Sequence, residues 1–237
     1  NHDTHMLNRV RPSHSVTSHW IRNMASQSGL VTSKAATADS IAPFQRIPWT
    51  AKLLAQPDLV VRLPSSLVPK QTNEDSLFAT TLRTPLTLRD LVSTYKQPRS
   101  AEAIISDVTT FCTLGNGMDG HPGLLHGGII GTLIDEAMGI LQTANFEREY
   151  ARRMALGETP SKNMGSFTAY LNVQYLKPVR TGMAVVIVAK HVKREGRKDW
   201  ITAEVKQAQS DQASPEESLV TCATGEGMFV GPKPSKL

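Results

Sequence analysis

The residues best suited to do chemistry stand together as His126-Gly127-Gly128, at the head of a long apolar stretch. If that stretch is a helix, its first N–H groups are unpaired and carry a positive partial charge. Glycine has no side chain, so a ligand oxygen can approach those groups closely. The run therefore predicts a site for an anion or a developing oxyanion. The alternative interpretation is that the glycines only let two elements pack closely.

Asp135 is the second candidate for a chemical role. It lies further along the same apolar stretch, at a position where aspartate has a poor helix propensity. A carboxylate buried among apolar side chains is costly unless it is paired or hydrogen-bonded. Asp135 could instead share a solvated face with Glu136. The apolar character of the surrounding helix favours a functional carboxylate.

These candidates lie on a helix that is followed by strands. We expect a helix over Leu124–Thr143, which is apolar on most sides and must therefore be largely enclosed. Side chains alternate between apolar and polar over 166–177, and a period of two indicates a strand. Three further strands are expected at 183–192, 200–209 and 218–230.

The remaining segments complete the predicted fold. Ahead of the long helix we expect a short helix over 85–96, a strand over 101–114 and a tight glycine-rich loop over 115–123. The polar range 147–162 is interpreted as an inserted connection. This order predicts an α+β fold in which an antiparallel sheet wraps around one long central helix.

By composition the chain divides into four parts. Residues 1–42 are rich in Arg and Ser and poor in acidic residues, which is typical of a mitochondrial transit peptide but also fits a disordered tail. Residues 43–75 hold five prolines and predict an extended arm, with a short helix after Pro48. We expect the folded domain over 76–231 and a tail at 232–237. Without a transit peptide the expected location is cytoplasmic.

Charge and cysteine content narrow the class of partner. The net charge is +5 and the pI is about 9.3, which suits a surface that meets phosphate groups. No dense Lys/Arg block and no apolar run long enough for a membrane span is present, so we expect neither nucleic acid nor a membrane span.

Cys112 and Cys222 are expected to be buried free thiols rather than a disulfide. No Cys/His spacing fits zinc, so no metal or other cofactor is expected.

Three motifs in order resemble the PaaI-like branch of the hotdog-fold acyl-CoA thioesterases. They are GHPGLLHGGIIGTLIDEAMG at 120–139, FTAYLNVQYLKPV at 167–179 and EGRK at 195–198. The first motif alone is weak, but three in the right order and spacing are specific. The resemblance covers about residues 76–231 and implies a hotdog fold and hydrolysis of acyl-CoA thioesters.

The resemblance also implies catalytic roles. Gly127 would donate its backbone N–H to the thioester carbonyl, and His126 would help to polarise that carbonyl or hold the loop. Asp135 would act as general base for water or as a nucleophile, and these alternatives stay open. Thr168 would orient the attacking water. Strict alternation in its strand turns Thr168 away from the helix, so this role needs a bulge or access around the sheet edge.

The coenzyme A portion of the substrate would contact a second group of residues. The resemblance places Gly128, Arg197 and Lys198 there, the two cations on a turn between strands. Clustered cations suit phosphates, although a charged turn is also an ordinary solvated feature.

The spacing of the two main candidates predicts a shared site. Gly127 and Asp135 are separated by 135 − 127 = 8 positions, or about 12 Å along a helix. An oxyanion donor and a catalytic carboxylate must both lie within roughly 3–4 Å of one reacting centre. If both are catalytic, they come from different subunits, and the expected assembly is a homodimer or a homotetramer.

Two other functions fit the same residues. A protein of this fold could release acyl groups from a carrier protein in a biosynthetic pathway. It could also bind acyl chains without catalysis, although the joint presence of His126, Gly127 and Asp135 argues against that.

Overall fold

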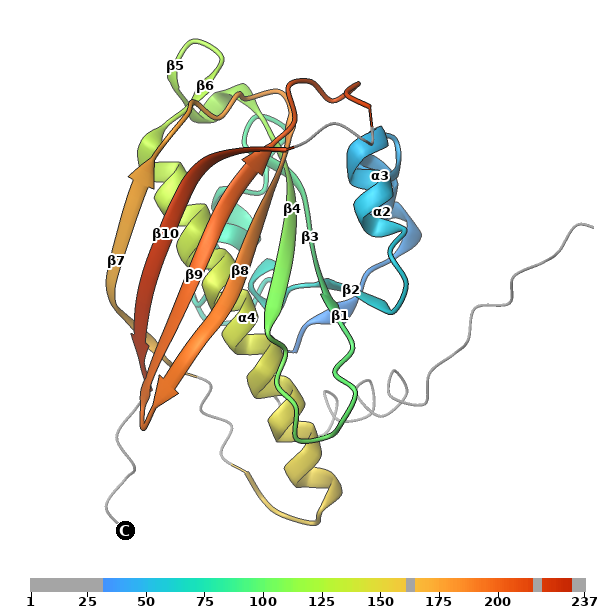
Figure 1. The fold of residues 1–237 in the computed structure, drawn as a ribbon, viewed down its shortest axis with the longest axis vertical. Coiled ribbons are helices and arrows are strands. Elements are labelled where there is room, and N and C mark those ends of the chain that lie inside the picture. Colours follow the sequence, from blue (N-terminus) through green and yellow to red (C-terminus); the bar gives the residue numbers. More distant parts are fainter. Residues whose placement is uncertain (1–31, 161–164, 215–218, 232–237) are drawn as a thin grey trace, which may run out of the picture. The chain divides into compact units, whose positions relative to one another are not determined.

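The computed structural model describes residues 32–160, 165–214 and 219–231. Its main sheet has eight antiparallel strands in the order β1-β2-β3-β4-β8-β9-β10-β7 (Figure 1). The strands are β1 Lys34–Ala35, β2 Leu59–Leu63, β3 Leu88–Lys96, β4 Asp107–Leu114, β7 Phe167–Tyr175, β8 Ala184–Glu195, β9 Lys198–Gln207 and β10 Val220–Val230. A separate hairpin joins β5 Asp119–His121 to β6 Leu124–Leu125.

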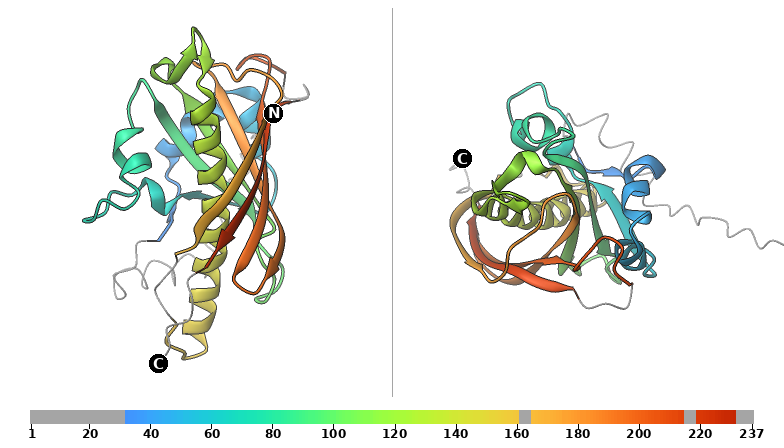
Figure 2. Two further views of the ribbon diagram at one scale, coloured as in Figure 1. Left: turned by 90° about the vertical axis from the view of Figure 1, so that its left-hand side faces the viewer. Right: turned by 90° about the horizontal axis from the view of Figure 1, so that it is seen from above.

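The long helix α4, Gly127–Ala155, lies along one face of this sheet and contacts β4, β7, β8, β9 and β10. Seen from above in Figure 2, the sheet curls around it. Ile134, Met138 and Leu141 are fully buried in the core between helix and sheet. The predicted α+β fold, an antiparallel sheet around one long central helix, is confirmed.

Two glycines let β10 approach α4 closely. A Cβ atom on Gly225 would lie 2.5 Å from Cγ2 of Ile134, and one on Gly227 would lie 2.7 Å from Sδ of Met138. Both distances are shorter than real carbon contacts allow. Glycine at these positions therefore sets how tightly the sheet closes on the helix.

The opposite face of the sheet carries two short helices, α2 Ala38–Gln45 and α3 Pro48–Leu54 (Figure 1). Phe44 and Trp49 are buried there against Val92, Phe111 and Val186. The rings of Phe44 and Phe111 meet edge to face with centroids 5.8 Å apart. The predicted helix after Pro48 is confirmed, with the proline at its first position as expected.

The expected short helix over 85–96 is wrong, because Leu88–Lys96 is strand β3. Leu91 packs toward α4 while the next residue, Val92, packs toward α2 and α3. A strand covered on both faces loses its apolar–polar alternation, and its apolar residues then mimic helical spacing.

The expected polar insert over 147–162 is also wrong for most of its length, because α4 continues to Ala155. Glu147 is held there by the backbone N–H of Ser33 at 2.6 Å and by Arg62 at 3.4 Å. Its carboxylate thus has partners, and the pKa of Glu147 is raised by burial. Residues 161–164 lie outside the described part.

The predicted N-terminal parts are joined to the sheet. Residues 34–42, expected in a tail, form β1 and the first part of α2. The arm contributes strand β2, which pairs with β3. It also contains a short 3₁₀-helix at Ser65–Leu67. Residues 1–31 and 232–237, on which the transit peptide and tail predictions fall, lie outside the described residues.

Other expectations concern cysteines and membranes. Cys112 and Cys222 are both free and buried, as predicted. No helix in the described ranges is long and apolar enough to cross a membrane. Within those ranges no group of three His, Cys, Asp or Glu residues could hold a metal ion.

Candidate functional site

His126 caps the start of α4. Its Nδ1 accepts the N–H of Gly128 at 3.0 Å, and its own N–H donates to the carbonyl of Met118 at 2.9 Å. Because Nδ1 is an acceptor here, a neutral ring carries its proton on Nε2. The exposed imidazole can therefore donate a hydrogen bond from Nε2 while it holds the first turn of the helix.

Gly127 is the first residue of α4. Within the described residues its N–H donates no hydrogen bond, whereas its carbonyl accepts the hydroxyl of Tyr175 at 3.0 Å. The Tyr175 ring lies in ordinary contact with the position that a Gly127 Cβ would take. An unpaired N–H at a helix start is suited to hold an oxyanion, and Tyr175 keeps this residue in place.

Asp135 is half-buried in the first third of α4. Its Oδ1 accepts the Thr168 hydroxyl at 2.9 Å, and in the described part of the chain its Oδ2 accepts no hydrogen bond. The hydrogen bond from Thr168 thus fixes the carboxylate through Oδ1, and Oδ2 stays free to contact a ligand. The structure brings Thr168 and Asp135 together, which strict alternation along the strand did not predict.

A bulge in β7 accounts for this contact. Thr168 pairs with Phe229 and Tyr170 pairs with Met228, so Ala169 is left without a partner on β10. One extra residue reverses the faces of the side chains beyond it. Thr168 therefore lies on the helix side of the sheet, and Phe167 is 70% exposed instead of facing the helix.

Glu136, next to Asp135, contacts a different element. It accepts a hydrogen bond from Ser66 of the N-terminal arm. Burial raises the pKa of Glu136 to about 7, although the Ser66 hydrogen bond opposes the shift. The two neighbouring carboxylates therefore differ in role: Asp135 meets the edge strand, and Glu136 ties the arm to α4.

The residues expected at coenzyme A lie in two places. Gly128 is at the start of α4, and its N–H is already taken by His126. Arg197 and Lys198 lie at the β8–β9 turn, where Gly196 adopts a φ of +58°. Lys198 pairs with Val230, which pairs with Phe167 of β7, so the two cations lie at the Thr168 end of the sheet.

The edge strand β7 links the two candidate groups. Thr168 near its beginning contacts Asp135, and Tyr175 at its end contacts Gly127. In the described part of the chain, β7 pairs only with β10 and leaves its other edge open. Phe167, Tyr170 and Tyr175 are 70%, 39% and 56% exposed along this strand.

Comparison with protein families identifies this arrangement. Residues 122–213, which include the start of α4, Asp135 and β7, match the family model described as the thioesterase superfamily. Over these residues the chain is similar to the thioesterase superfamily. Its sheet around a central helix is the hotdog fold of that superfamily.

Two curated relatives are similar to part of the chain. An uncharacterized protein of Schizosaccharomyces pombe is 35% identical over 118 residues, which are 50% of this chain and 55% of the relative. Verlamelin biosynthesis protein B of Lecanicillium sp is 28% identical over 139 residues, 49% of this chain and 58% of the relative. The chain thus spans a little over half the length of these relatives.

Solved structures show a more distant likeness. A Bacillus halodurans protein solved with CoA is 24% identical with a TM-score of 0.36, covering 54% of this chain and 68% of its own. A Streptococcus mutans protein bound to acetyl CoA is 16% identical with a TM-score of 0.39, covering 53% and 80%. Likenesses of this extent say nothing of what the present chain binds.

Sequence reasoning missed two residues of this site. Tyr175 was recognised only as part of a strand, although an aromatic residue at the end of a strand is well suited to reach a neighbouring helix start. Ser66 lies in the arm outside the motifs, and no pattern in the sequence connects it with Glu136.

Proposed function

We propose that this protein hydrolyses acyl-CoA thioesters to a free carboxylic acid and CoA. The observation that carries the proposal is that one edge strand, β7, contacts both Gly127 and Asp135 of α4. The backbone N–H of Gly127 donates no hydrogen bond within the described residues, and Asp135 has one carboxylate oxygen without a donor there. Gly127 would bind the carbonyl oxygen of the thioester as negative charge develops on it. His126 would donate from Nε2 toward the same oxygen.

The site would be completed by a second copy of the chain. Gly127 and Asp135 of one chain remain eight positions apart on α4 and contact opposite ends of β7. If two β7 edges pair antiparallel about the midpoint of 168 and 175, (168 + 175)/2 = 171.5, Thr168 of one subunit faces Tyr175 of the other. Asp135 of the partner subunit would then approach Gly127.

The same pairing would bring the basic turn to the site. Arg197 and Lys198 lie at the Thr168 end of their own sheet, so the partner's turn would reach the Gly127 end of this subunit. There the two cations would meet phosphates of CoA. Gly128 would contact the carrier chain near the start of α4.

Two chemical routes fit the proposed site. As general base, Asp135 would take a proton from a water oriented by Thr168, and the water oxygen would attack the carbonyl carbon. As nucleophile, Asp135 Oδ2 would attack that carbon, expel the CoA thiolate and form a mixed anhydride that water then hydrolyses. In both routes the thiolate leaves with the electron pair of the carbon–sulfur bond and is protonated.

The variant Asp135→Asn tests the proposal. It keeps an acceptor for Thr168 but cannot take a proton or attack, so kcat for acyl-CoA should fall by about 10²–10⁴-fold. The exposed Asp107→Asn is the matched control and should leave kcat unchanged. Full activity of Asp135→Asn with unaltered folding would sink the assignment. Label on Asp135 after a single turnover in ¹⁸O-water would show the nucleophilic route, because water that attacks the aspartyl carbonyl of the anhydride leaves its oxygen on Asp135.

A second candidate is release of an acyl group from a carrier protein. One relative is named for the biosynthesis of verlamelin, which favours a biosynthetic intermediate as substrate. Turnover of matched acyl-CoA and acyl-carrier substrates separates the two. The mitochondrial location stays a proposal, which microscopy of the tagged full chain tests. A role in fatty acid metabolism also stays a proposal.

A further inference from the structure

Strands β9, β10 and β7 align large side chains across their pairing register. Trp200 of β9 lies opposite Met228 of β10, and Met228 lies opposite Tyr170 of β7. In the next row toward the β8–β9 turn, Val230 of β10 lies opposite Phe167 of β7. We name these five side chains the outer patch.

The outer patch faces away from α4. Thr168 contacts Asp135 on the helix side and pairs with Phe229, so the next side chain on β10, Met228, points to the opposite face. Among the described residues, no member of the patch belongs to the buried core on either side of the sheet. Figures 1 and 2 show α2 and α3 at the β3–β4 side of the sheet, away from β7 and β10. These helices therefore leave the patch uncovered.

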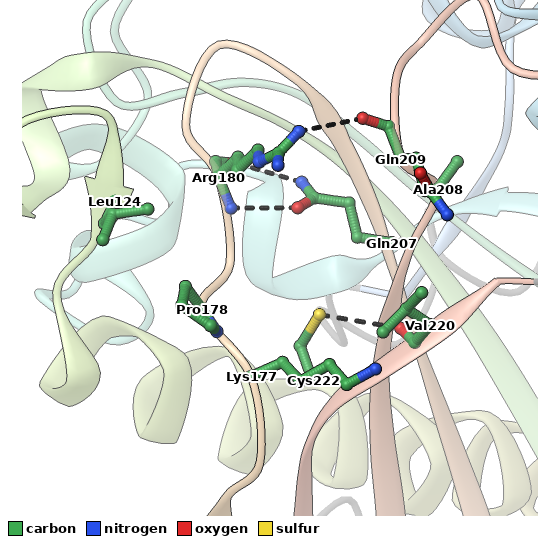
Figure 3. Close-up of a pocket in the computed structure, with 9 residues that line it drawn as sticks. All are labelled: Leu124, Lys177, Pro178, Arg180, Gln207, Ala208, Gln209, Val220 and Cys222. Carbon is green, nitrogen blue, oxygen red and sulfur yellow. Dashed lines mark hydrogen bonds between the residues drawn. The ribbon is translucent and has the colours of Figure 1, made fainter.

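Apolar groups are arranged differently at the two ends of β7. Beyond its end, apolar side chains line a cavity of about 400 Å³, and Figure 3 shows the Cys222 sulfur pointing into that space. At the beginning of the strand, Phe167 and Tyr170 are 70% and 39% exposed on the surface. Trp200, Met228 and Val230 beside them are half-buried. A contiguous group of exposed apolar side chains marks a surface that contacts a partner.

Cations lie beside the outer patch on the β8–β9 hairpin. Residues 190–199 contain five Lys or Arg and two acidic residues, a net charge of 5 − 2 = +3. The Nζ of Lys193 lies 4.5 Å from the centroid of the Trp200 ring. Lys190 lies on the same face, because its neighbour Ala189 is in the core beside α4. The Lys190 and Lys193 side chains are 57% and 53% exposed.

The charge and the residue types together decide which partner fits this face. A second copy of the chain stacked patch to patch would bring the lysines of both copies beside one apolar contact, where like charges repel. An anionic surface is attracted instead. Aromatic side chains next to lysines are the combination that enters the boundary between the headgroups and acyl chains of an anionic membrane.

We propose that the outer patch and the lysines beside it dock this protein on the surface of an anionic lipid membrane. Phe167 and Tyr170 insert among the headgroups, and Lys190 and Lys193 contact lipid phosphates. This attachment requires neither a membrane-spanning helix nor hydrolysis of a thioester. If two β7 edges pair as proposed above, both outer patches lie on the same face of one continuous sheet, so one membrane engages both.

Co-sedimentation of the full chain with vesicles tests the proposal. One preparation contains two parts phosphatidylcholine to one part phosphatidylglycerol, and the other contains phosphatidylcholine alone. The wild-type chain should bind the anionic vesicles at least about tenfold more tightly than the neutral ones. Lys190→Gln/Lys193→Gln should weaken binding to anionic vesicles at least about tenfold, because two cations near the surface are lost. Phe167→Gln/Tyr170→Gln should weaken it by a similar factor, because the rings no longer insert.

Matched controls make the same kinds of change on other elements. Arg46→Gln/Arg83→Gln removes two exposed cations, and Leu86→Gln removes a side chain that is 63% exposed. Both controls should bind anionic vesicles like the wild-type chain. Residues 1–31 are identical in every variant, so their cations cannot account for a difference. Lys190 and Lys193 are chosen because Arg197 and Lys198 are assigned to CoA in the proposed function.

Several outcomes would overturn the proposal. They are an absence of binding to anionic vesicles, unaltered binding by either double variant, and an equal loss of binding in the controls. If ultracentrifugation without lipid shows that Phe167→Gln/Tyr170→Gln breaks up a larger assembly of the wild-type chain, a second copy occupies the patch instead. Binding to polyglutamate but not to vesicles, lost in Lys190→Gln/Lys193→Gln, would assign the face to an acidic protein.

Discussion

At the scale of single residues, Gly127 offers the cleanest test of an oxyanion donor. It is the first residue of α4, where proline is favoured because its missing N–H has no helical partner. The preceding His126 already has φ −61° and ψ 134°, the region that a following proline requires. Gly127→Pro should therefore keep the fold but lower kcat by about 10²–10³-fold. Circular dichroism and steady-state kinetics measure the two effects, and undiminished kcat would remove Gly127 from the mechanism.

Glu136 predicts a pH dependence of stability. Its pKa rises from 4.5 to about 7 on folding, so the native state binds the proton more tightly than the unfolded state. Linkage then makes the protein lose stability as pH rises from about 4.5 to 7. Glu136→Gln should remove this loss and be more stable than wild type at pH 8 by about 1–3 kcal/mol.

Urea unfolding at several pH values measures this difference, which should vanish below about pH 4.5. A constant difference across the range would show that Glu136 does not titrate as described.

Residue types and spacing predicted that His126, Gly127 and Asp135 are site candidates. Two adjacent glycines at the start of a helix are unusual, and so is a carboxylate within an apolar stretch. Thr168 was predicted by resemblance against the strand alternation. The bulge at Ala169 that resolves the conflict depends on pairing with β10, which a single strand's pattern does not contain. Ser66 and Tyr175 depend on tertiary contacts in the same way.

At the scale of elements, the approach of β10 to α4 should be sensitive to one methyl group. Gly225→Ala would place a Cβ 2.5 Å from Ile134, and both are held by the core. Overpacking of this kind should destabilise the protein by about 1–3 kcal/mol. Gly139→Ala is the matched control, because nothing lies within 4 Å of its Cβ position and alanine favours a helix. Chemical denaturation compares the two, and a neutral Gly225→Ala would contradict the tight contact.

Strands covered on one face were predicted well, since β7, β9 and β10 keep a period of two. The fully covered β3 was mistaken for a helix, and the polar second half of α4 for an insert. In both cases the deciding information is what packs on the element. The arm and α2 enclose β3, and Arg62 and Ser33 hold Glu147 on α4.

At the scale of the whole molecule, the proposed sharing of the site between two subunits predicts that two inactive variants complement each other. In a heterodimer of Gly127→Pro and Asp135→Asn, one of the two sites would contain an intact Gly127 and an intact Asp135. Random mixing of equal amounts makes half of the dimers mixed, so about a quarter of wild-type activity should return. The measurement is activity after joint refolding, with each variant refolded alone as control. No recovery despite mixed dimers would place both groups in one chain.

The helices α2 and α3 have a consequence for higher assembly. They occupy the outer surface of β3, β4 and β8 with the chain's own Phe44 and Trp49. A second dimer that stacked sheet against sheet would have to displace those two side chains from their buried, apolar contacts. If the protein forms a tetramer, we therefore expect the second dimer to contact the uncovered strands or the helix side, because α2 and α3 would block back-to-back stacking.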